Sequence, residues 1–259
     1  MAQSSADIAF GDNSRGLQLG QNFGHVHIAA ERPETPPKPS SNVPFRRDPH
    51  FVKRTTLTDQ LRAKLLVPAG RAALVGLGGV GKSQLAIEYA CQLRQQLPQT
   101  WVLWIHASNV ARFDQSVGDV VDQLKIPGRK DTKADLLQLL RSWLRDEGKG
   151  SWLIVLDNAD DAGFLLEPSA TASGARLAQR RIDYIPSCNH GSMIITTRNK
   201  NEALKLVYES DMIDVLPMSE GEAEALLEKK LGQPNSDNRQ LVRALDCMPL
   251  AVTQAAAYI

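Results

Sequence analysis

The sequence has few cysteines, few aromatic residues, no excess of charge of either sign and no long apolar run. Its three cysteines lie far apart and form no CxxC pair, which argues against a disulfide framework or a zinc site and for reduced, mostly buried thiols. The formal net charge of +1 lacks the basic excess of a dedicated nucleic-acid binder. No run of about 18 apolar residues is present to span a bilayer, and residues 1–13 lack the basic and apolar regions of a secretory signal. We therefore expect a cytoplasmic protein with no membrane span and no nucleic-acid partner.

The composition divides the chain into three zones. Residues 1–30 are small and polar, rich in Gly, Asn and Gln, and predict a disordered N-terminal arm. Residues 31–44 contain five prolines, which cannot pair in a central strand or continue a helix, so this zone predicts a semi-rigid linker. Residues 45–259 alternate apolar runs with helical patterns. We expect one folded domain over 45–259.

Short aliphatic and β-branched runs in this domain are candidates for strands, and stretches with helical spacing separate them. Leucines recur every fourth residue over 57–65, and apolar residues gather on one helical face over 136–144. Strands that alternate with helices favour a parallel sheet covered on both faces, so the sequence predicts an α/β fold. The predicted strands are Ala72–Gly76, Trp101–His106, Trp152–Asp157, Met193–Thr197 and Met212–Val215.

A glycine-rich loop follows the first predicted strand and matches the phosphate-binding pattern GxxxxGK[ST] over residues 76–83. Its glycines permit the backbone to turn successive N–H groups toward phosphate oxygens, and the helix that follows adds the positive end of its dipole. In this pattern Lys82 reaches the β- and γ-phosphates and the Ser83 hydroxyl binds Mg²⁺. The predicted phosphate-binding residues are Gly76, Gly78, Gly79, Val80, Gly81, Lys82, Ser83 and Gln84. We therefore expect the chain to bind ATP or ADP with Mg²⁺.

Two further predicted strands end in polar residues that belong at the same sheet edge. Asp157 ends an apolar strand, and the carboxyl ends of parallel strands face the ligand, so we expect Asp157 beside the bound Mg²⁺. The next residue is Asn158, whose amide cannot accept a proton, so we expect at most a slow ATPase; Asp160 and Asp161 are alternatives that spacing alone leaves open. Arg198 follows the strand over 193–197, where its guanidinium can sense a γ-phosphate.

The order of these blocks resembles the NB-ARC domain, the nucleotide-binding domain of STAND-type P-loop NTPases and NOD-like receptors. Residues 51–61 (FVKRTTLTDQL) resemble the family's sequence block that precedes the phosphate-binding loop. Residues 101–108 (WVLWIHAS) resemble the block in which family members carry a tryptophan. LIVLDNAD resembles the second kinase motif, GSMIITTR the sensor block, and CMPLAVTQAAAYI, residues 247–259, the GLPL block. The resemblance covers about residues 45–259. The chain ends within or just after the last block, so we expect a truncated architecture or a fragment.

This resemblance implies a fold, a set of base contacts and a mode of action. The fold is a three-layer αβα P-loop NTPase with a five-stranded parallel sheet in the order 5-1-4-3-2. Phe51, Val52 and Arg54 are implied to frame the adenine, and Pro249 to pack on the base. The family acts as a switch in which ADP holds a closed form and ATP opens it, after which protomers self-associate. Asn158 and Cys247 depart from the family's usual second acid and glycine.

The N-terminal arm carries a second candidate motif over residues 11–30. Low charge, no proline, alternating apolar residues and Asn/Gln content favour in-register stacked strands, although a floppy tail is the alternative. The segment Leu17-Gln18-Leu19-Gly20, followed by Asn22, resembles the RHIM amyloid core and, more closely, the amyloid-signalling motifs of fungal NOD-like receptors. The resemblance implies that assembled arms template a matching motif on a cell-death execution protein, in innate-immune or incompatibility-type programmed cell death.

Other functional classes are less well supported by the sequence. A P-loop ATPase without a signalling role remains an alternative, although no LSGGQ-type stretch of a transporter is present. A GTPase would need an Asn-Lys-x-Asp motif, which is absent from the sequence. A STAND-type transcription regulator would need a helix-turn-helix segment and a basic face, and the sequence indicates neither.

Overall fold

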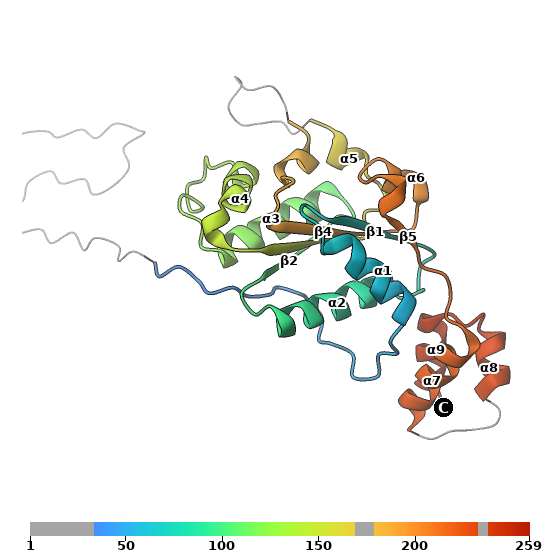
Figure 1. The fold of residues 1–259 in the computed structure, drawn as a ribbon. Helices are drawn as coiled ribbons and strands as arrows, with labels where there is room; N and C mark the ends of the chain where they lie inside the picture. The colour runs from blue at the N-terminus through green and yellow to red at the C-terminus, as the bar shows by residue number, and fades with distance from the viewer. Residues whose placement is uncertain (1–33, 169–178, 233–237) are drawn as a thin grey trace, which may run out of the picture. The chain divides into compact units, whose positions relative to one another are not determined.

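Five apolar segments form one parallel sheet in the computed structural model (Figure 1). The structure describes residues 34–168, 179–232 and 238–259. The sheet order is β2-β3-β4-β1-β5, which confirms the order implied by the resemblance. The strands are β1 (Arg71–Val75), β2 (Trp101–His106), β3 (Trp152–Asp157), β4 (Gly191–Thr197) and β5 (Met212–Asp214). The predicted strands differ from these only at their ends.

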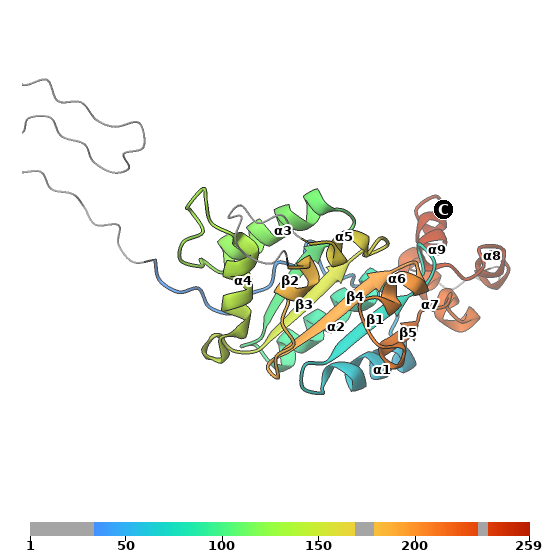
Figure 2. The same ribbon diagram turned by 90° about the horizontal axis from the view of Figure 1, so that it is seen from above.

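Helices cover both faces of the sheet, as Figure 2 shows from above. In β3 the side chains alternate: Leu153 and Val155 pack in the hydrophobic cluster with α1 and α2, whereas Ile154 and Leu156 pack in the cluster with α3 and α4. Both faces of β3 are therefore buried, which explains its unbroken apolar run. The covering helices are α1 (Thr55–Leu65) and α2 (Lys82–Gln96) on one face, and α3 (Val110–Gln123), α4 (Leu136–Arg145), α5 (Gly163–Leu166) and α6 (Lys200–Leu204) on the other. The three-layer αβα fold is thus confirmed.

Three further helices form a separate unit of packing, which we call the C-terminal helical cluster: α7 (Glu220–Leu231), α8 (Asn238–Ala244) and α9 (Pro249–Ala256). They lie to one side of the sheet (Figure 1). Helix α7 begins with a capping box between Ser219 and Glu222, and α9 begins with a proline in its first turn. The small core of the cluster consists of Ala223, Leu226, Leu227, Val242 and Val252.

The proline-rich segment before α1 is tied to the sheet edge. Strand β2 lies at this edge, and the backbone N–H of Val102 donates to Ser40 O (3.1 Å) while that of Asn42 donates to Val102 O (3.3 Å). The Asn42 side chain extends the pairing, because its Oδ1 accepts from Trp104 N (2.6 Å) and its Nδ2 donates to Trp104 O (3.1 Å). Residues 36–259 accordingly form one compact unit. The segment shields an edge strand that would otherwise present unpaired backbone groups.

The structure also bears on the few cysteines and on the lack of a long apolar run. The cysteines Cys91, Cys188 and Cys247 are all unpaired, and each is partly exposed rather than buried. Among helices in the described ranges, none combines the length and apolar character that crossing a bilayer requires.

Candidate nucleotide-binding site

The glycine-rich loop connects the end of β1 to the start of α2 and has a backbone that favours glycine. Gly79 has φ 86° and Gly81 has φ 95°, both in the left-handed region. A Cβ at Gly79 would also lie 3.1 Å from Leu250 Cβ, so a side chain here would push against α9. The loop is therefore shaped by its glycines and in contact with the C-terminal helical cluster.

The backbone N–H groups of this loop fit an anion. Among the described residues, none accepts a hydrogen bond from the N–H of Gly79, Gly81 or Lys82. The loop also precedes the fifteen-residue helix α2, whose N-terminus carries the positive end of the helix dipole. Free N–H donors at a helix N-terminus are the arrangement that binds phosphate.

Lys82 bridges the two sides of the loop. Its Nζ donates to Gly76 O (2.7 Å) and to Leu77 O (2.8 Å), and its side chain is nearly buried. Burial is the largest influence on the pKa of the Lys82 amine and lowers it; the Asp160 carboxylate raises it and the Arg198 guanidinium lowers it further. The amine is thus held at the loop between groups of both signs.

Oxygen ligands suited to Mg²⁺ meet at the ends of β3 and β4. Asp157 Oδ1 accepts hydrogen bonds from Ser83 Oγ (2.7 Å) and from Thr196 Oγ1 (2.7 Å). Mg²⁺ prefers oxygen ligands and usually takes only one or two from the protein, with phosphates and water completing its shell. Ser83 and Asp157 therefore fit a Mg²⁺–nucleotide. Sequence reasoning missed Thr196, for which the signal was a polar residue inside a buried strand.

Asn158, immediately after β3, has a backbone that suits an asparagine. Its φ is 66°, in the left-handed region that asparagine and aspartate tolerate better than other side chains. Its backbone N–H donates to Thr196 Oγ1 (2.8 Å), so the strained turn is held against β4. The amide side chain lines the same cavity as Lys82.

Arg198 lies over the loop and is paired with Asp160. Its Nε is 3.3 Å from Asp160 Oδ2, and its backbone N–H donates to Asp160 Oδ1 (2.7 Å). A Cβ at Gly78 would lie 3.4 Å from Arg198 Cζ, so the guanidinium covers the loop. The Arg198 side chain is 62% exposed, which leaves it free to exchange partners.

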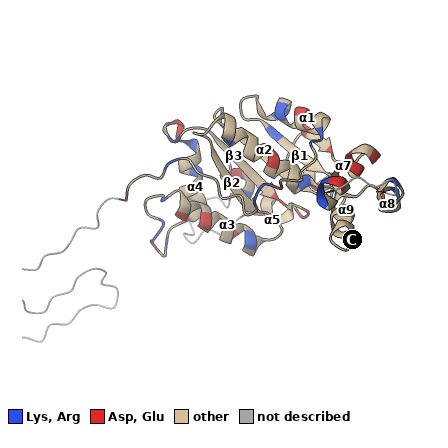
Figure 3. Ribbon diagram, turned by 90° about the horizontal axis from the view of Figure 1, so that it is seen from below, with Lys and Arg blue, Asp and Glu red and all other residues tan. Residues whose placement is uncertain are grey.

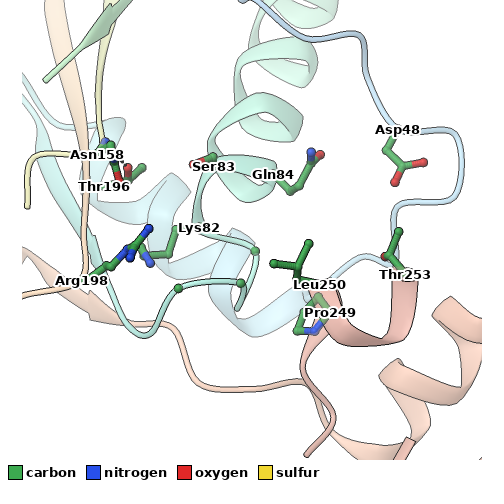
Figure 4. A pocket seen from close by; sticks show the side chains of 13 residues that line it. Asp48, Lys82, Ser83, Gln84, Asn158, Thr196, Arg198, Pro249, Leu250 and Thr253 are labelled. Carbon is green, nitrogen blue, oxygen red and sulfur yellow. Dashed lines mark hydrogen bonds between the residues drawn. The ribbon is translucent and has the colours of Figure 1, made fainter. Parts of the chain in front are cut away.

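These groups surround one cavity of about 320 Å³, seen in Figure 4. Lys82 and Arg198 lie at one end of it, and Asp48 and Thr253 at the other. The predicted site residues that line it are Gly78, Gly79, Gly81, Lys82, Ser83, Gln84, Arg198 and Pro249. Sequence reasoning did not select Asp48, Thr196, Leu250 or Thr253, which also line it.

The remaining predicted nucleotide-binding residues lie outside the lining of this cavity. Phe51 packs against the core under α1 and α2, and Val52 packs against the core of the C-terminal helical cluster. Gly76 and Val80 lie within the loop, where the Val80 side chain is buried in the core. The residues of the predicted amyloid core (Leu17, Gln18, Leu19, Gly20 and Asn22) fall outside the described residues.

Arg54 joins the loop to the C-terminal helical cluster. Its guanidinium donates to Val80 O (3.3 Å), Leu216 O (2.8 Å) and Pro217 O (3.1 Å). Its Nε also lies 3.7 Å from Glu222 Oε2 in the first turn of α7. Burial lowers the pKa of Arg54, and the Glu222 charge opposes that shift. A buried cation with three backbone acceptors fixes the position of the segment that leads into α7.

A comparison with known proteins finds a relative of similar sequence. The chain is 35% identical over 233 residues to a nucleotide-binding leucine-rich repeat (NLR)-like protein of Hyaloscypha variabilis, a match over 84% of this chain and 23% of the relative. The chain thus spans about a quarter of the length of this curated relative. No protein-family model matches the sequence.

Solved structures of low sequence identity share the fold. A Walker-type ATPase of Pyrococcus abyssi has a TM-score of 0.55 at 15% identity, over 80% of this chain and 67% of that one. A STAND protein with a tetratricopeptide repeat sensor from Pyrococcus horikoshii has a TM-score of 0.50 at 17% identity, over 80% of this chain and 30% of that one. The fold is therefore that of the P-loop NTPases.

Proposed function

We propose that this chain is the nucleotide-binding region of an NLR-type signalling switch that holds ADP or ATP together with Mg²⁺. One observation carries the proposal: a single cavity takes its walls from the phosphate-binding loop, the end of β4 and the start of α9. A nucleotide in that cavity would contact both the sheet and the C-terminal helical cluster. The similarity to an NLR-like protein supports the same assignment.

The chain's own residues divide the work of binding. The N–H groups of the loop and the Lys82 amine hold phosphate oxygens. Ser83 and Asp157 hold the metal, which would neutralise phosphate charge. Pro249 and Leu250 supply an apolar wall for the base. Phe51, Val52 and Arg54 stay proposed adenine neighbours, since Asp48 brings the same segment to the cavity.

Discrimination between ADP and ATP falls to Lys82 and Arg198. A γ-phosphate offers Arg198 a partner in place of Asp160, and a ligand shifts a conformational equilibrium only through such differential contacts. Turnover is expected to be slow, because Asn158 cannot accept a proton and Asp160 already accepts from Arg198. The proposed cycle is retention and exchange of nucleotide rather than rapid hydrolysis.

The output of the switch is proposed to be assembly. Open protomers self-associate in the cytoplasm and gather their N-terminal arms, which raises the local concentration of the segment Leu17–Gly20 with Asn22. The arms then adopt a stacked β arrangement and recruit a cell-death execution protein that carries a matching motif. This part rests on the sequence resemblance alone.

The nucleotide content of natively purified protein tests the binding proposal. We expect wild-type protein to retain ADP, and Lys82→Ala to lose it with a fall in affinity of at least about tenfold, because a charged hydrogen bond to phosphate is removed. Lys149→Ala removes an exposed lysine far from the cavity and is the control. Wild-type protein that contains no nucleotide and ignores added ADP and ATP would refute the proposal.

The arm is tested separately with a peptide of residues 11–30. It should form fibrils that bind thioflavin, and Gln18→Asp should abolish them, because stacked like charges repel along a fibril. Fibrils of equal yield from both peptides would contradict the role of this motif.

A further inference from the structure

A second cavity, of about 460 Å³, lies at the opposite end of the sheet from the phosphate-binding loop. Arg71 lines it and begins β1, whereas the loop follows Val75 at the end of the same strand. At about 3.3 Å per residue the two ends of β1 are about 13 Å apart. The cavity is therefore independent of the nucleotide-binding site proposed above.

This second cavity is strongly basic. Among the described residues, five cationic side chains line it, with a single carboxylate, that of Asp183. The cations are Arg71 from β1, Arg141 and Arg145 from α4, Arg180, and Lys205 after α6. The whole chain has a net charge of only +1, and charges of both signs are interspersed over the rest of the ribbon (Figure 3). This concentration of positive charge is therefore local.

Part of this charge is neutralised within the protein. Asp183 accepts two hydrogen bonds from Arg180, both 2.9 Å, and Glu202 accepts one from Lys205 (2.7 Å). Arg71 donates to neutral oxygens, those of Ser187 Oγ (2.8 Å) and Ile185 O (3.4 Å). These contacts orient the Arg71 guanidinium, and only the nearby Asp183 carboxylate offsets part of its charge among the described residues.

The two arginines of α4, Arg141 and Arg145, are the least neutralised cations of this cavity. They are four residues apart, so they lie on one helix face, where like charges repel. Arg141 donates to Gln179 Oε1 (2.6 Å), but its Nε is fully buried and has no hydrogen-bond partner among the described residues. Arg145 is exposed and has no ion-pair partner in the described ranges. Guanidinium groups that repel one another around a cavity are stabilised when an anion binds among them.

We propose that this cavity binds a small soluble anion with two or more phosphate groups. The guanidinium fork matches phosphate oxygens in pairs. The cations project from separate elements around a cavity of ligand size, so one phosphate group reaches only some of them. Arg71, Arg141 and Arg145 are its principal ligands.

Inorganic pyrophosphate is the probe, titrated calorimetrically into the Lys82→Ala protein, in which the phosphate-binding loop lacks its lysine. We expect saturable binding, at least about tenfold tighter than that of orthophosphate. The variant with Arg141→Gln and Arg145→Gln should lose at least about tenfold in affinity. Arg239→Gln with Arg243→Gln removes two arginines at the same spacing from α8 and should change affinity by less than about twofold.

Thermal stability shows whether a loss of pyrophosphate binding reflects a loss of folding. In anion-free buffer, Arg145→Gln should melt no lower than the parent protein, because it relieves like-charge repulsion, and it should still weaken pyrophosphate binding. Equal affinity in the α4 and α8 variants, absence of pyrophosphate binding, or orthophosphate binding as tight as pyrophosphate would each overturn the proposal. None of these results depends on whether ADP binds at the loop.

Discussion

The hydrophobic core around the sheet is much larger than that of the C-terminal helical cluster. Hydrophobic clusters cover both faces of the sheet, and every residue of β3 is buried. The C-terminal helical cluster has five buried apolar residues and meets the loop through a few contacts, such as Leu250 N to Gly79 O (3.2 Å). The sheet therefore positions the phosphate and metal ligands on a large core, whereas the cluster places one wall of the cavity on a small core. A nucleotide between them would couple the two.

The largest effect is expected from the same substitution made in each region. Leu153 in β3 and Leu227 in α7 are both fully buried. Leu153→Ala should lower the free energy of unfolding of the sheet by about 3 kcal/mol through a cavity in its core. Leu227→Ala should mainly raise hydrogen exchange in α7–α9 while amides of β1 and β3 stay protected. Equal loss of protection in the sheet after Leu227→Ala would show that the two regions unfold as one.

Removal of the Arg54 guanidinium should detach the cluster. Arg54→Ala leaves the carbonyl groups of Val80, Leu216 and Pro217 without this donor, at a cost of about 2–4 kcal/mol. Chemical denaturation and hydrogen exchange of α7 measure the effect. Arg180→Ala is the matched control, because Arg180 is half exposed and its partner Asp183 is a third exposed (two hydrogen bonds of 2.9 Å), so its loss should cost less. A larger effect from Arg180→Ala than from Arg54→Ala would contradict the role of Arg54 as the connecting residue.

A gain of stability is expected at Cys247, between α8 and α9. Its φ is 51°, in the left-handed region. The NB-ARC domains that this sequence resembles usually have glycine at this position. Cys247→Gly should relieve the strain and stabilise the cluster by about 1 kcal/mol. Thermal denaturation measures the gain, with Cys188→Gly as a control that removes a thiol elsewhere. Destabilisation by Cys247→Gly would mean that the side chain contributes more by packing than its backbone costs.

The smallest effect is a loosening of the cluster in acid through Asp48. Burial acts to raise the pKa of Asp48, but hydrogen bonds from Lys230 and the backbone of His50 outweigh it, so the pKa lies below its ordinary value. Its contribution is present above the unfolded pKa of about 3.9 and is lost as pH falls through the folded pKa. Hydrogen exchange in α7 should therefore increase below about pH 4 in wild type, and less in Asp48→Asn. An identical acid response in the two proteins would exclude Asp48 as the cause.

Much of the fold could be predicted because local signals and tertiary context agree. Strand β3 is apolar from Trp152 to Leu156 because both of its faces are buried. The residue spacing of the loop from Gly76 to Ser83 is specific to phosphate-binding loops. Helix α3 was missed, although Phe113 and Val117 lie four apart on its buried face. Its apolar residues are outnumbered by polar ones, so its pattern is weaker than that of α4.

The parts of the site that were missed come from long-range packing. Asp48 and Thr253 reach the cavity from segments separated by about two hundred residues, and no local spacing links them. The position of Arg54 against Leu216 and Pro217 likewise depends on how the chain returns after β5. The pairing of Arg198 with Asp160 could be suspected from sequence, but only the sheet order brings their strand ends together.

Hydrogen exchange with and without ADP and Mg²⁺ tests the central claim most directly, namely that one nucleotide bridges the sheet and the C-terminal helical cluster. We predict that ADP protects backbone amides both in the loop over residues 76–83 and in α9, and that Lys82→Ala abolishes both effects together. Protection confined to the loop, with α9 unchanged in wild-type protein, would contradict it.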